Sequence, residues 1–263
     1  MKTVMKNRSI KTVLMAVAAL FFLQLGRANA QQKAAKKTAK NIVLVHGAFA
    51  DGAGWRAVYD ILTKKNYHVS IVQNPLTSLA DDVRATNSVL DKQVGDVVLV
   101  GHSWGGMVIT EAGQHPKVAS LVYVAAFAPE KGQSAGAIES IHPLSDAAGF
   151  TAPDKQGFVY FEPAKFHTGF ANGLSQEESD FLCKSQGPIQ GKCFDETVDY
   201  VAWKHKPSYG IVALEDEAIS PITERDMYKR AGAQITEVKG GHLIFISHAE
   251  QVAKVIMDAA DGK

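Results

Sequence analysis

The stretch VVLVGHSWGG, residues 97–106, decides the fold of this chain. Residues 97–100 are apolar and mostly β-branched, which is typical of a strand buried on both faces. The pattern G-x-S-x-G follows at 101–105, and a helix is predicted over 104–114. A serine at such a strand-to-helix turn projects its hydroxyl above the carboxyl edge of the sheet. Ser103 is therefore the candidate nucleophile, and a glycine-rich turn that only packs a helix against the sheet is the alternative.

On both sides of this stretch, predicted strands alternate with predicted helices. Such alternation predicts an α/β fold, a mostly parallel sheet with helices on both faces. The pattern is interrupted once, over about 129–207, by sequence rich in Gly, Pro, Ser and Phe. We expect one domain over 41–263, with this interruption as an inserted cap or lid. The predicted strands are 42–45, 67–72, 97–100, 118–125, 209–214 and 234–238.

The base that would activate Ser103 is sought downstream, because a serine hydroxyl is a weak nucleophile on its own. At this kind of turn the order along the chain is Ser, acid, His. His242 follows two glycines in a loop after a predicted strand, where a side chain can reach across the sheet edge. His248 lies in SHAE, residues 247–250, which matches a capping box opening the last helix. We therefore expect His242 to be the base.

Three carboxylates, Glu215, Asp216 and Glu217, follow the predicted strand at 211–214. Their position in the chain does not choose among them. Asp216 is the preferred acid, because a short side chain just past a strand end orients an imidazole with little rotamer freedom. Glu215 and Glu217 are expected to be solvated.

The oxyanion hole in this geometry takes one backbone amide from the residue after the nucleophile, Trp104, and one from the loop after the first strand. His46-Gly47-Ala48-Phe49 occupies that loop. We expect Ala48 to supply the second amide, with Phe49 as the alternative, and His46 to be a structural turn residue.

Aromatic side chains near these positions predict an apolar substrate pocket. The candidate wall residues are Phe49, Phe127 and Trp203. Aromatic residues in a cap are as often its core, which is the alternative for all three.

The composition is that of a soluble globular protein, with 28 Lys and Arg against 27 Asp and Glu and 46% hydrophobic residues in a chain of 263. It excludes a disordered chain, collagen and a polytopic membrane protein. Nine basic residues and no acid lie in the first 40 positions. The remaining 19 basic residues face 27 acids, a net charge of −8 over 41–263, so no nucleic-acid surface is expected.

The first 30 residues have the three parts of a cleavable signal peptide. Residues 1–11 are basic, 12–25 are nearly all apolar, and ANA at 28–30 offers small residues to a signal peptidase. A membrane anchor is the alternative, but 14 apolar residues are too few for a bilayer core that needs about 20. We expect cleavage after Ala30, a periplasmic or secreted protein without stable membrane insertion, and a basic flexible tether over 31–40.

Cys183 and Cys193 are the only cysteines of the chain. In an exported protein an isolated pair ten positions apart predicts a disulfide, with two buried free thiols as the alternative. A metal site would need further Cys or His at ligand spacing, so no metal is expected.

From Asn41 onward the chain resembles the α/β-hydrolase superfamily, and within it the small bacterial esterase-type members. The resemblance is carried by IVLVHGAFADGAGW (42–55), VLVGHSWGGMVIT (98–110), YVAAFAPEKGQS (123–134), IVALEDEAISP (211–221) and GGHLIFISHAEQVAKVI (240–256). It implies a serine hydrolase that needs no cofactor and cleaves a small-molecule carboxylic ester through an acyl-enzyme. The roles it implies are nucleophile for Ser103, acid for Asp216, base for His242 and oxyanion amides for Ala48 and Trp104.

Other functions stay open at this point, because one fold hosts many chemistries. Lyases and perhydrolases share this scaffold. An NAD(P)-dependent oxidoreductase is weakly indicated by GAGWRA at 52–57, which matches G-x-G-x-x-A but begins too far after the strand and lacks the ribose-binding acid. A binding protein that keeps the fold without turnover is the third alternative.

Overall fold

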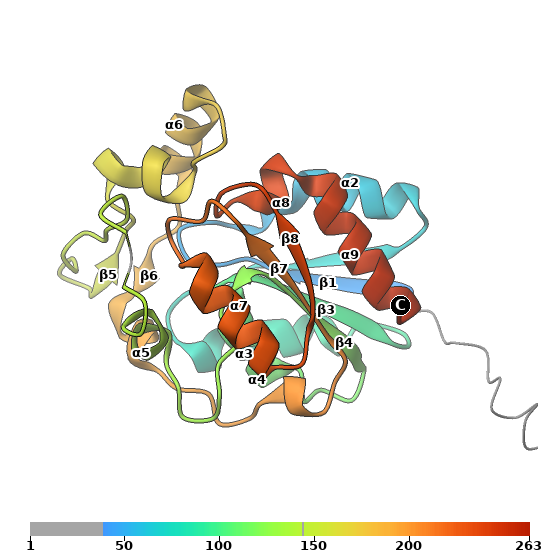
Figure 1. Cartoon of the computed structure of the whole chain (residues 1–263). Helices are drawn as coiled ribbons and strands as arrows, with labels where there is room; N and C mark the ends of the chain where they lie inside the picture. The colour runs from blue at the N-terminus through green and yellow to red at the C-terminus, as the bar shows by residue number, and fades with distance from the viewer. Residues whose placement is uncertain (1–38, 144) are drawn as a thin grey trace, which may run out of the picture. The chain divides into compact units, whose positions relative to one another are not determined.

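The structure, a computed structural model, describes residues 39–143 and 145–263. The signal peptide expected over 1–30 and most of the tether expected over 31–40 lie outside the described residues. The described residues contain a six-stranded sheet in the order β2-β1-β3-β4-β7-β8, in which every neighbouring pair is parallel (Figure 1). The predicted α/β fold is thereby confirmed. The strands are β1 (Asn41–Val45), β2 (His68–Val72), β3 (Val97–Ser103), β4 (Val118–Ala126), β7 (Ser208–Ala213) and β8 (Gln234–Val238).

The central strands are buried because helices cover both faces of the sheet. β1, β3 and β7 contain only buried residues, which explains why their sequences are continuous apolar runs and do not alternate with polar residues. The edge strands β2 and β8 are partly exposed.

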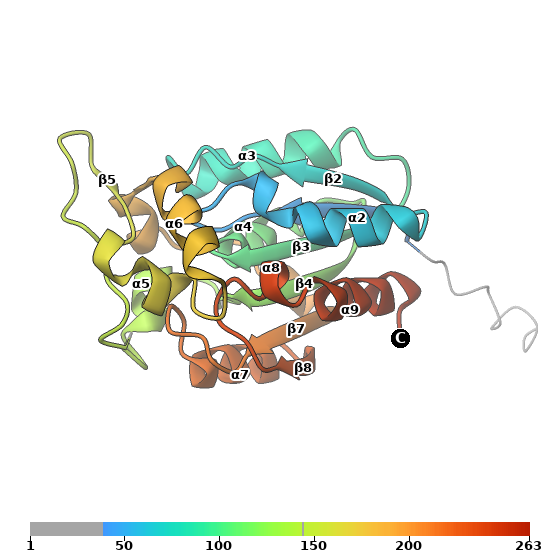
Figure 2. The same cartoon turned by 90° about the horizontal axis from the view of Figure 1, so that it is seen from above.

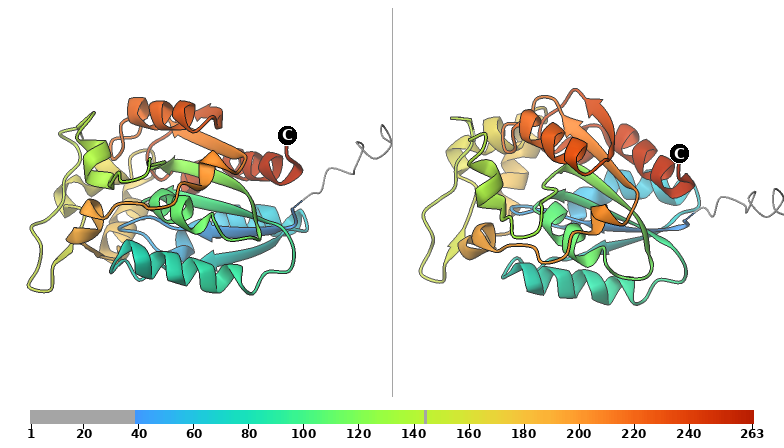
Figure 3. Two further views of the ribbon diagram at one scale, coloured as in Figure 1. Left: turned by 90° about the horizontal axis from the view of Figure 1, so that it is seen from below. Right: turned by 60° about the horizontal axis from the view of Figure 1, so that its bottom comes forward.

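Helices α2, α8 and α9 cover one face of the sheet, seen from above in Figure 2, and α3, α4 and α7 cover the other, seen from below in Figure 3. Their starts follow capping chemistry: Ser78 accepts a hydrogen bond from Asp81 N before α3, and Ser220 accepts one from Ile222 N before α7. No helix in the described ranges combines the length and apolar composition needed to cross a membrane. The bounds are α2 (Arg56–Lys64), α3 (Leu79–Leu90), α4 (Gly105–Ala112), α7 (Pro221–Arg230), α8 (Ile244–Ser247) and α9 (Ala249–Asp261).

Tyr228 of α7 fixes the carboxyl end of β4. Its hydroxyl accepts a hydrogen bond from Ala126 N at 2.8 Å and donates one to Ala126 O at 2.9 Å. Ala126 is the register partner of Ser103 in the neighbouring strand β3. Burial raises the pKa of Tyr228 well above its usual value, so the hydroxyl keeps the proton that it donates. The helical layer thus holds the strand ends beside the candidate nucleophile.

Residues 127–207, the cap segment, connect β4 to β7. Most of the cap segment lies beyond the carboxyl ends of the strands (Figure 2), and its last part, over 199–207, runs past α4 back to the start of β7. Phenylalanine rings form much of the cap interior, where Phe161 contacts Phe166 and Phe170 with ring centroids 5.9 and 5.2 Å apart. β5 and β6 pair as a small antiparallel sheet. The elements of the cap segment are α5 (Ala135–Glu139), β5 (Phe158–Val159), η2 (Pro163–Lys165), η3 (Phe166–Phe170), α6 (Gln176–Ser185), β6 (Ile189–Gln190), η4 (Gly191–Asp195) and η5 (Ala202–Lys204).

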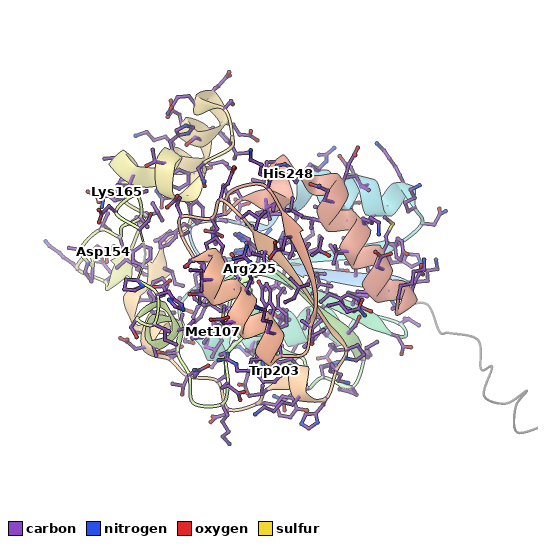
Figure 4. All side chains as sticks on the ribbon, viewed as in Figure 1. Met107, Asp154, Lys165, Trp203, Arg225 and His248 are labelled. Carbon is purple, nitrogen blue, oxygen red and sulfur yellow. The ribbon has the colours of Figure 1, made fainter. Side chains whose placement is uncertain are left out.

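The capping box predicted at 247–250 is wrong. Ser247 is the last residue of α8 and its N–H donates to Leu243 O at 3.2 Å, so it ends one helix and does not cap the next. His248 lies between α8 and α9 with φ −129° and shares a 2.9 Å hydrogen bond from Nδ1 to Ser247 Oγ (Figure 4). The break in the backbone at His248 starts α9 at Ala249 without a side-chain cap.

The disulfide predicted between Cys183 and Cys193 is also wrong for this structure, in which both are free thiols. The two sulfurs face different partners. Cys193 Sγ lies 3.9 Å from Leu76 O, whereas Cys183 Sγ lies 3.9 Å from Gln186 Nε2 on its own helix segment. Burial raises the pKa of the Cys193 thiol to about 12, which makes it an unreactive core residue.

Candidate active site

Ser103 occupies a strained turn at the end of β3. Its φ is +53°, in the left-handed region that side chains other than glycine seldom adopt. The flanking glycines allow this geometry: a Cβ on Gly101 would lie 2.5 Å from Gly105 O, and one on Gly105 would lie 2.7 Å from Val45 O. The G-x-S-x-G spacing therefore follows from close backbone contacts around the serine.

His242 and Asp216 form a buried pair. His242 Nδ1 lies 2.6 Å from Asp216 Oδ2, and Asp216 Oδ1 accepts hydrogen bonds from Ala218 N at 2.7 Å and Ile219 N at 2.8 Å. Because a carboxylate accepts, Nδ1 carries the proton and Nε2 is left with a free lone pair. The pair can therefore orient an imidazole whose Nε2 takes up a proton.

The other two carboxylates of this turn lie outside the site. Glu215 is exposed, and its Oε1 lies 3.7 Å from Lys239 Nζ in a surface ion pair. Glu217 is half-exposed and does not line the cavity that contains Ser103.

Ser103 and His242 line the same small cavity, together with Ala48 and Trp104. Neither Ala48 N–H nor Trp104 N–H donates a hydrogen bond to another group of the described residues. Two unpaired amides beside a serine suit an oxyanion. The cavity has a volume of about 20 Å³, room for one water molecule. Its remaining wall residues are Phe49, Phe127, Glu139, Phe150, Phe161, Phe170, Phe194, Ala218 and Ile219.

Phe49 and Phe127 reach this cavity, as expected for pocket residues, but Trp203 does not. Trp203 belongs to η5 (Figure 4), where its Nε1 donates to Pro129 O at 2.9 Å and Lys204 Nζ lies over its ring. The expectation for Trp203 is corrected. Its indole lies against the start of the cap segment, because its N–H donates to the backbone carbonyl of Pro129.

His102 is a functional candidate that the sequence analysis missed. Its Nε2 lies 3.1 Å from His242 O and donates to that carbonyl, which holds the loop of the candidate base. Burial lowers the pKa of His102 well below its usual value, so the ring is neutral. The residue was visible as the x of G-x-S, but its partner lies 140 positions further on.

Asp82 was also missed, because its partner Trp104 lies 22 positions further along the chain. Its Oδ2 accepts from Trp104 Nε1 at 2.8 Å and its Oδ1 from Leu76 N at 2.8 Å. Burial raises the pKa of Asp82 to about 6. A carboxylate in α3 thereby fixes the indole of the residue that follows the candidate nucleophile.

His46 has the structural role expected of it. Asn74 N donates to His46 Nε2 at 2.9 Å, so the opposite nitrogen, Nδ1, carries the proton and donates to Gly47 O at 2.9 Å. Asn74 Nδ2 also donates to His46 O at 2.8 Å. These bonds tie the loop that contains Ala48 to the end of β2.

Glu224 lies buried behind Asp216. Its Oε2 accepts a hydrogen bond from Ala213 N at 3.0 Å. Burial first, and then the negative charge of Asp216, raise the pKa of Glu224 well above its usual value of 4.5. Glu224 therefore keeps its proton to a higher pH than a free glutamic acid side chain does.

Glu224→Gln tests this protonation state through stability. The unfolded chain releases the Glu224 proton near 4.5, whereas the folded protein keeps it to a higher pH. Between the pKa of Glu224 in the unfolded chain and its pKa in the folded protein, the folded state binds more protons. Rising pH therefore lowers the free energy of unfolding, by about 1.4 kcal/mol for each unit by which these two pKa values differ. Glutamine does not titrate and can make the same bonds. We expect the melting temperature of wild type to fall relative to the variant as the pH rises above 4.5, and a constant difference would contradict the assignment.

The segment GAGWRA at 52–57 forms no phosphate-binding turn. Gly52–Trp55 is the short helix η1, which Asp51 caps by accepting from Ala53 N. A Cβ on Gly54 would lie 3.1 Å from the Phe245 ring, so packing explains this glycine. Within 39–143 and 145–263, no group of three or more His, Cys, Asp or Glu side chains is arranged to hold a metal ion.

Comparison with protein families gives a match to the model of the alpha/beta hydrolase family over residues 42–255. A carbendazim hydrolyzing esterase of Nocardioides sp. (strain SG-4G) is 30% identical over 181 residues, which cover 63% of this chain and 66% of that protein. A pyrethroid hydrolase of Sphingobium wenxiniae is 25% identical over 264 residues, which cover 85% of this chain and 89% of that protein.

Solved structures share the same architecture. An extracellular alpha/beta-hydrolase from a Paenibacillus species has a TM-score of 0.70 at 23% identity, over 83% of this chain and 98% of that chain. Polyneuridine aldehyde esterase has a TM-score of 0.73 at 19% identity, again over 83% of this chain and 98% of that chain. At these identities the likeness concerns the fold.

Proposed function

The chain belongs to the alpha/beta hydrolase family, and from this premise we propose that it hydrolyses carboxylic esters through an acyl-enzyme on Ser103. The curated relatives that it matches include an esterase and a pyrethroid hydrolase, which supports ester hydrolysis. The substrate would be a small-molecule ester, and the chemistry needs only side chains and backbone amides of this chain.

One observation carries the proposal. A strained serine, the histidine of a buried His–Asp pair and two residues with unpaired backbone amides line one cavity. A serine hydrolase needs these parts in one place, because the nucleophile, its base and the oxyanion donors act on the same carbonyl group.

In the proposed reaction, Ser103 Oγ attacks the ester carbonyl carbon while His242 Nε2 takes the hydroxyl proton. The carbonyl oxygen becomes an oxyanion that accepts hydrogen bonds from Ala48 N and Trp104 N. When the intermediate collapses, the C–O bond to the alcohol breaks and His242 returns the proton to the leaving oxygen. Water then repeats both steps on the acyl-enzyme and releases the acid. Asp216 keeps the imidazole in the required tautomer throughout.

The test is the rate of p-nitrophenyl acetate hydrolysis by the purified protein, before and after the change Ser103→Ala. A protein of this family without turnover would release no p-nitrophenolate above the buffer rate.

We also propose that residues 1–30 direct export and are removed after Ala30, on the strength of their basic, apolar and small-residue parts. Protein recovered from the periplasm or medium is expected to begin at Gln31, as read by mass spectrometry of its N-terminal peptide. Ala30→Leu should block the peptidase and accumulate the precursor. Full-length chain found only in the cytoplasm would overturn this proposal.

A further inference from the structure

The wall of the cavity beside Ser103 holds one ionisable side chain that the proposed reaction does not use. Glu139, the last residue of α5, lines this cavity together with Ser103 and His242. Among the described wall residues, no other carboxyl group faces the space. The carboxyl group therefore lies where a bound ester would be.

Glu139 has no partner among the residues that the structure describes. Its side chain is partly buried, yet within the described ranges it makes no hydrogen bond or ion pair. Burial alone raises its pKa to about 7, with no contribution from a neighbouring charge. An unpaired carboxyl group in an apolar place is costly, which is expected where a ligand supplies the missing partner.

The position of Glu139 is built into the cap segment. Ser134 caps α5 by accepting a hydrogen bond from Ala137 N at 3.2 Å, and it also forms an antiparallel bridge with Thr197. A Cβ on Gly136 would lie 3.1 Å from Phe194 O, so α5 packs closely on η4. These contacts fix the backbone of α5 on the cap segment, and thereby place Glu139 at the wall of the cavity.

Most of the other wall residues of the cavity are aromatic. Phe49 and Phe150 have ring centroids 5.4 Å apart, and Phe150 stacks on Phe194 at 5.2 Å. The ring of Phe170 lies 5.1 Å from that of His242. Aromatic faces attract cations, and a carboxylate among such faces provides the counter-charge for an ammonium group.

A larger groove adjoins this cavity. It has a volume of about 450 Å³, and the rings of Phe49 and Phe170 line both spaces. Because the cavity itself has room for only one water molecule, an ester reaches Ser103 only if this shared wall moves. The groove is mostly apolar, and its charged residues are Asp51, Asp60 and Glu178 against Arg56, which pairs with Asp60 at 2.9 Å. The groove is therefore acidic, and residues 41–263 carry a net charge of −8. Both charges favour cationic ligands.

We propose that the site binds esters that carry an ammonium group, with Glu139 as the counter-ion and the surrounding phenylalanine rings as the cage. The proposal rests on the ester hydrolysis proposed above and names its substrate class. Glu139 would act as a specificity residue that contacts the substrate and takes no part in the proton transfers.

Calorimetric titration with choline and with neohexyl alcohol tests the binding without any reaction. The two molecules have the same shape, but a neutral carbon replaces the ammonium nitrogen in the second. At about pH 8, where a carboxyl with raised pKa is mostly ionised, wild type should bind choline more tightly. Glu139→Gln should lower the affinity for choline about tenfold. Glu177→Gln, the same charge change at an exposed site of α6 that lines neither space, should leave it unchanged.

Equal binding of the two alcohols by wild type, binding of neither, or an unchanged preference in Glu139→Gln would overturn the proposal. Glu139→Asp, which keeps the charge, should retain part of the preference and serves if the glutamine variant does not fold.

Hydrolysis of acetylcholine and neohexyl acetate separates this proposal from the proposed function. We expect the ratio of their kcat/KM values to favour acetylcholine in wild type and to fall about tenfold in Glu139→Gln. A protein that binds choline through Glu139 but hydrolyses neither ester would contradict the proposed function and leave the ammonium site in place. Hydrolysis of both esters with equal kcat/KM in wild type would contradict the ammonium site and leave the proposed function in place.

Discussion

Ser103→Ala is expected to lower kcat/KM for p-nitrophenyl acetate by on the order of 10⁵-fold, because the change removes the atom that becomes acylated. The fold should persist, since Ser103 is a small side chain at the edge of a cavity and alanine removes only the hydroxyl. Initial rates of p-nitrophenolate release, with the melting temperature measured by circular dichroism, check both statements.

Ser120→Ala is the matched control for this change. Ser120 is also a buried serine, on β4, but its hydroxyl lies 3.4 Å from Ala259 O and it does not line the cavity. We expect its kcat/KM to stay within about twofold of wild type. Retained turnover in Ser103→Ala, or an equal loss in both variants, would show that another group is the nucleophile.

His242→Ala is expected to reduce kcat/KM by a similar factor. The change removes the base that takes the Ser103 proton in the proposed reaction, and effects within a cooperating set of residues are not additive. The double variant Ser103→Ala, His242→Ala should therefore be no slower than either single variant, as measured by steady-state rates with substrate in excess.

His248→Ala is the control, because this second histidine lies at the break between α8 and α9 and bonds to Ser247 Oγ. It should cost some stability and little activity. If His248→Ala were the damaging change and His242→Ala the mild one, the base would be misassigned.

The fold could be predicted from the sequence because its signals are local. The run at 97–100 is apolar because helices cover both faces of its strand. Glycine is required at 101 and 105 because a Cβ there would collide with the backbone of the turn or of the neighbouring strand. The positions of Asp216 and His242 follow from the same logic, since loops after parallel strands meet at one edge of the sheet.

The rest of the site depends on contacts between distant segments. His102 reaches His242 across 140 positions, and Trp104 reaches Asp82 across 22. Glu139 lies in the cap segment, where short elements have no periodic pattern that would aim a side chain at the sheet. The cysteine pair was mispredicted because a spacing of ten says nothing about where each sulfur points.

The most direct test of the central claim is to trap the nucleophile. Wild-type protein is treated with a fluorophosphonate, digested, and the labelled peptide is sequenced by mass spectrometry. We expect a single phosphonate adduct on Ser103, formed in wild type, slowed greatly in His242→Ala and absent in Ser103→Ala. An adduct on any other residue, or undiminished labelling of Ser103→Ala, would contradict it.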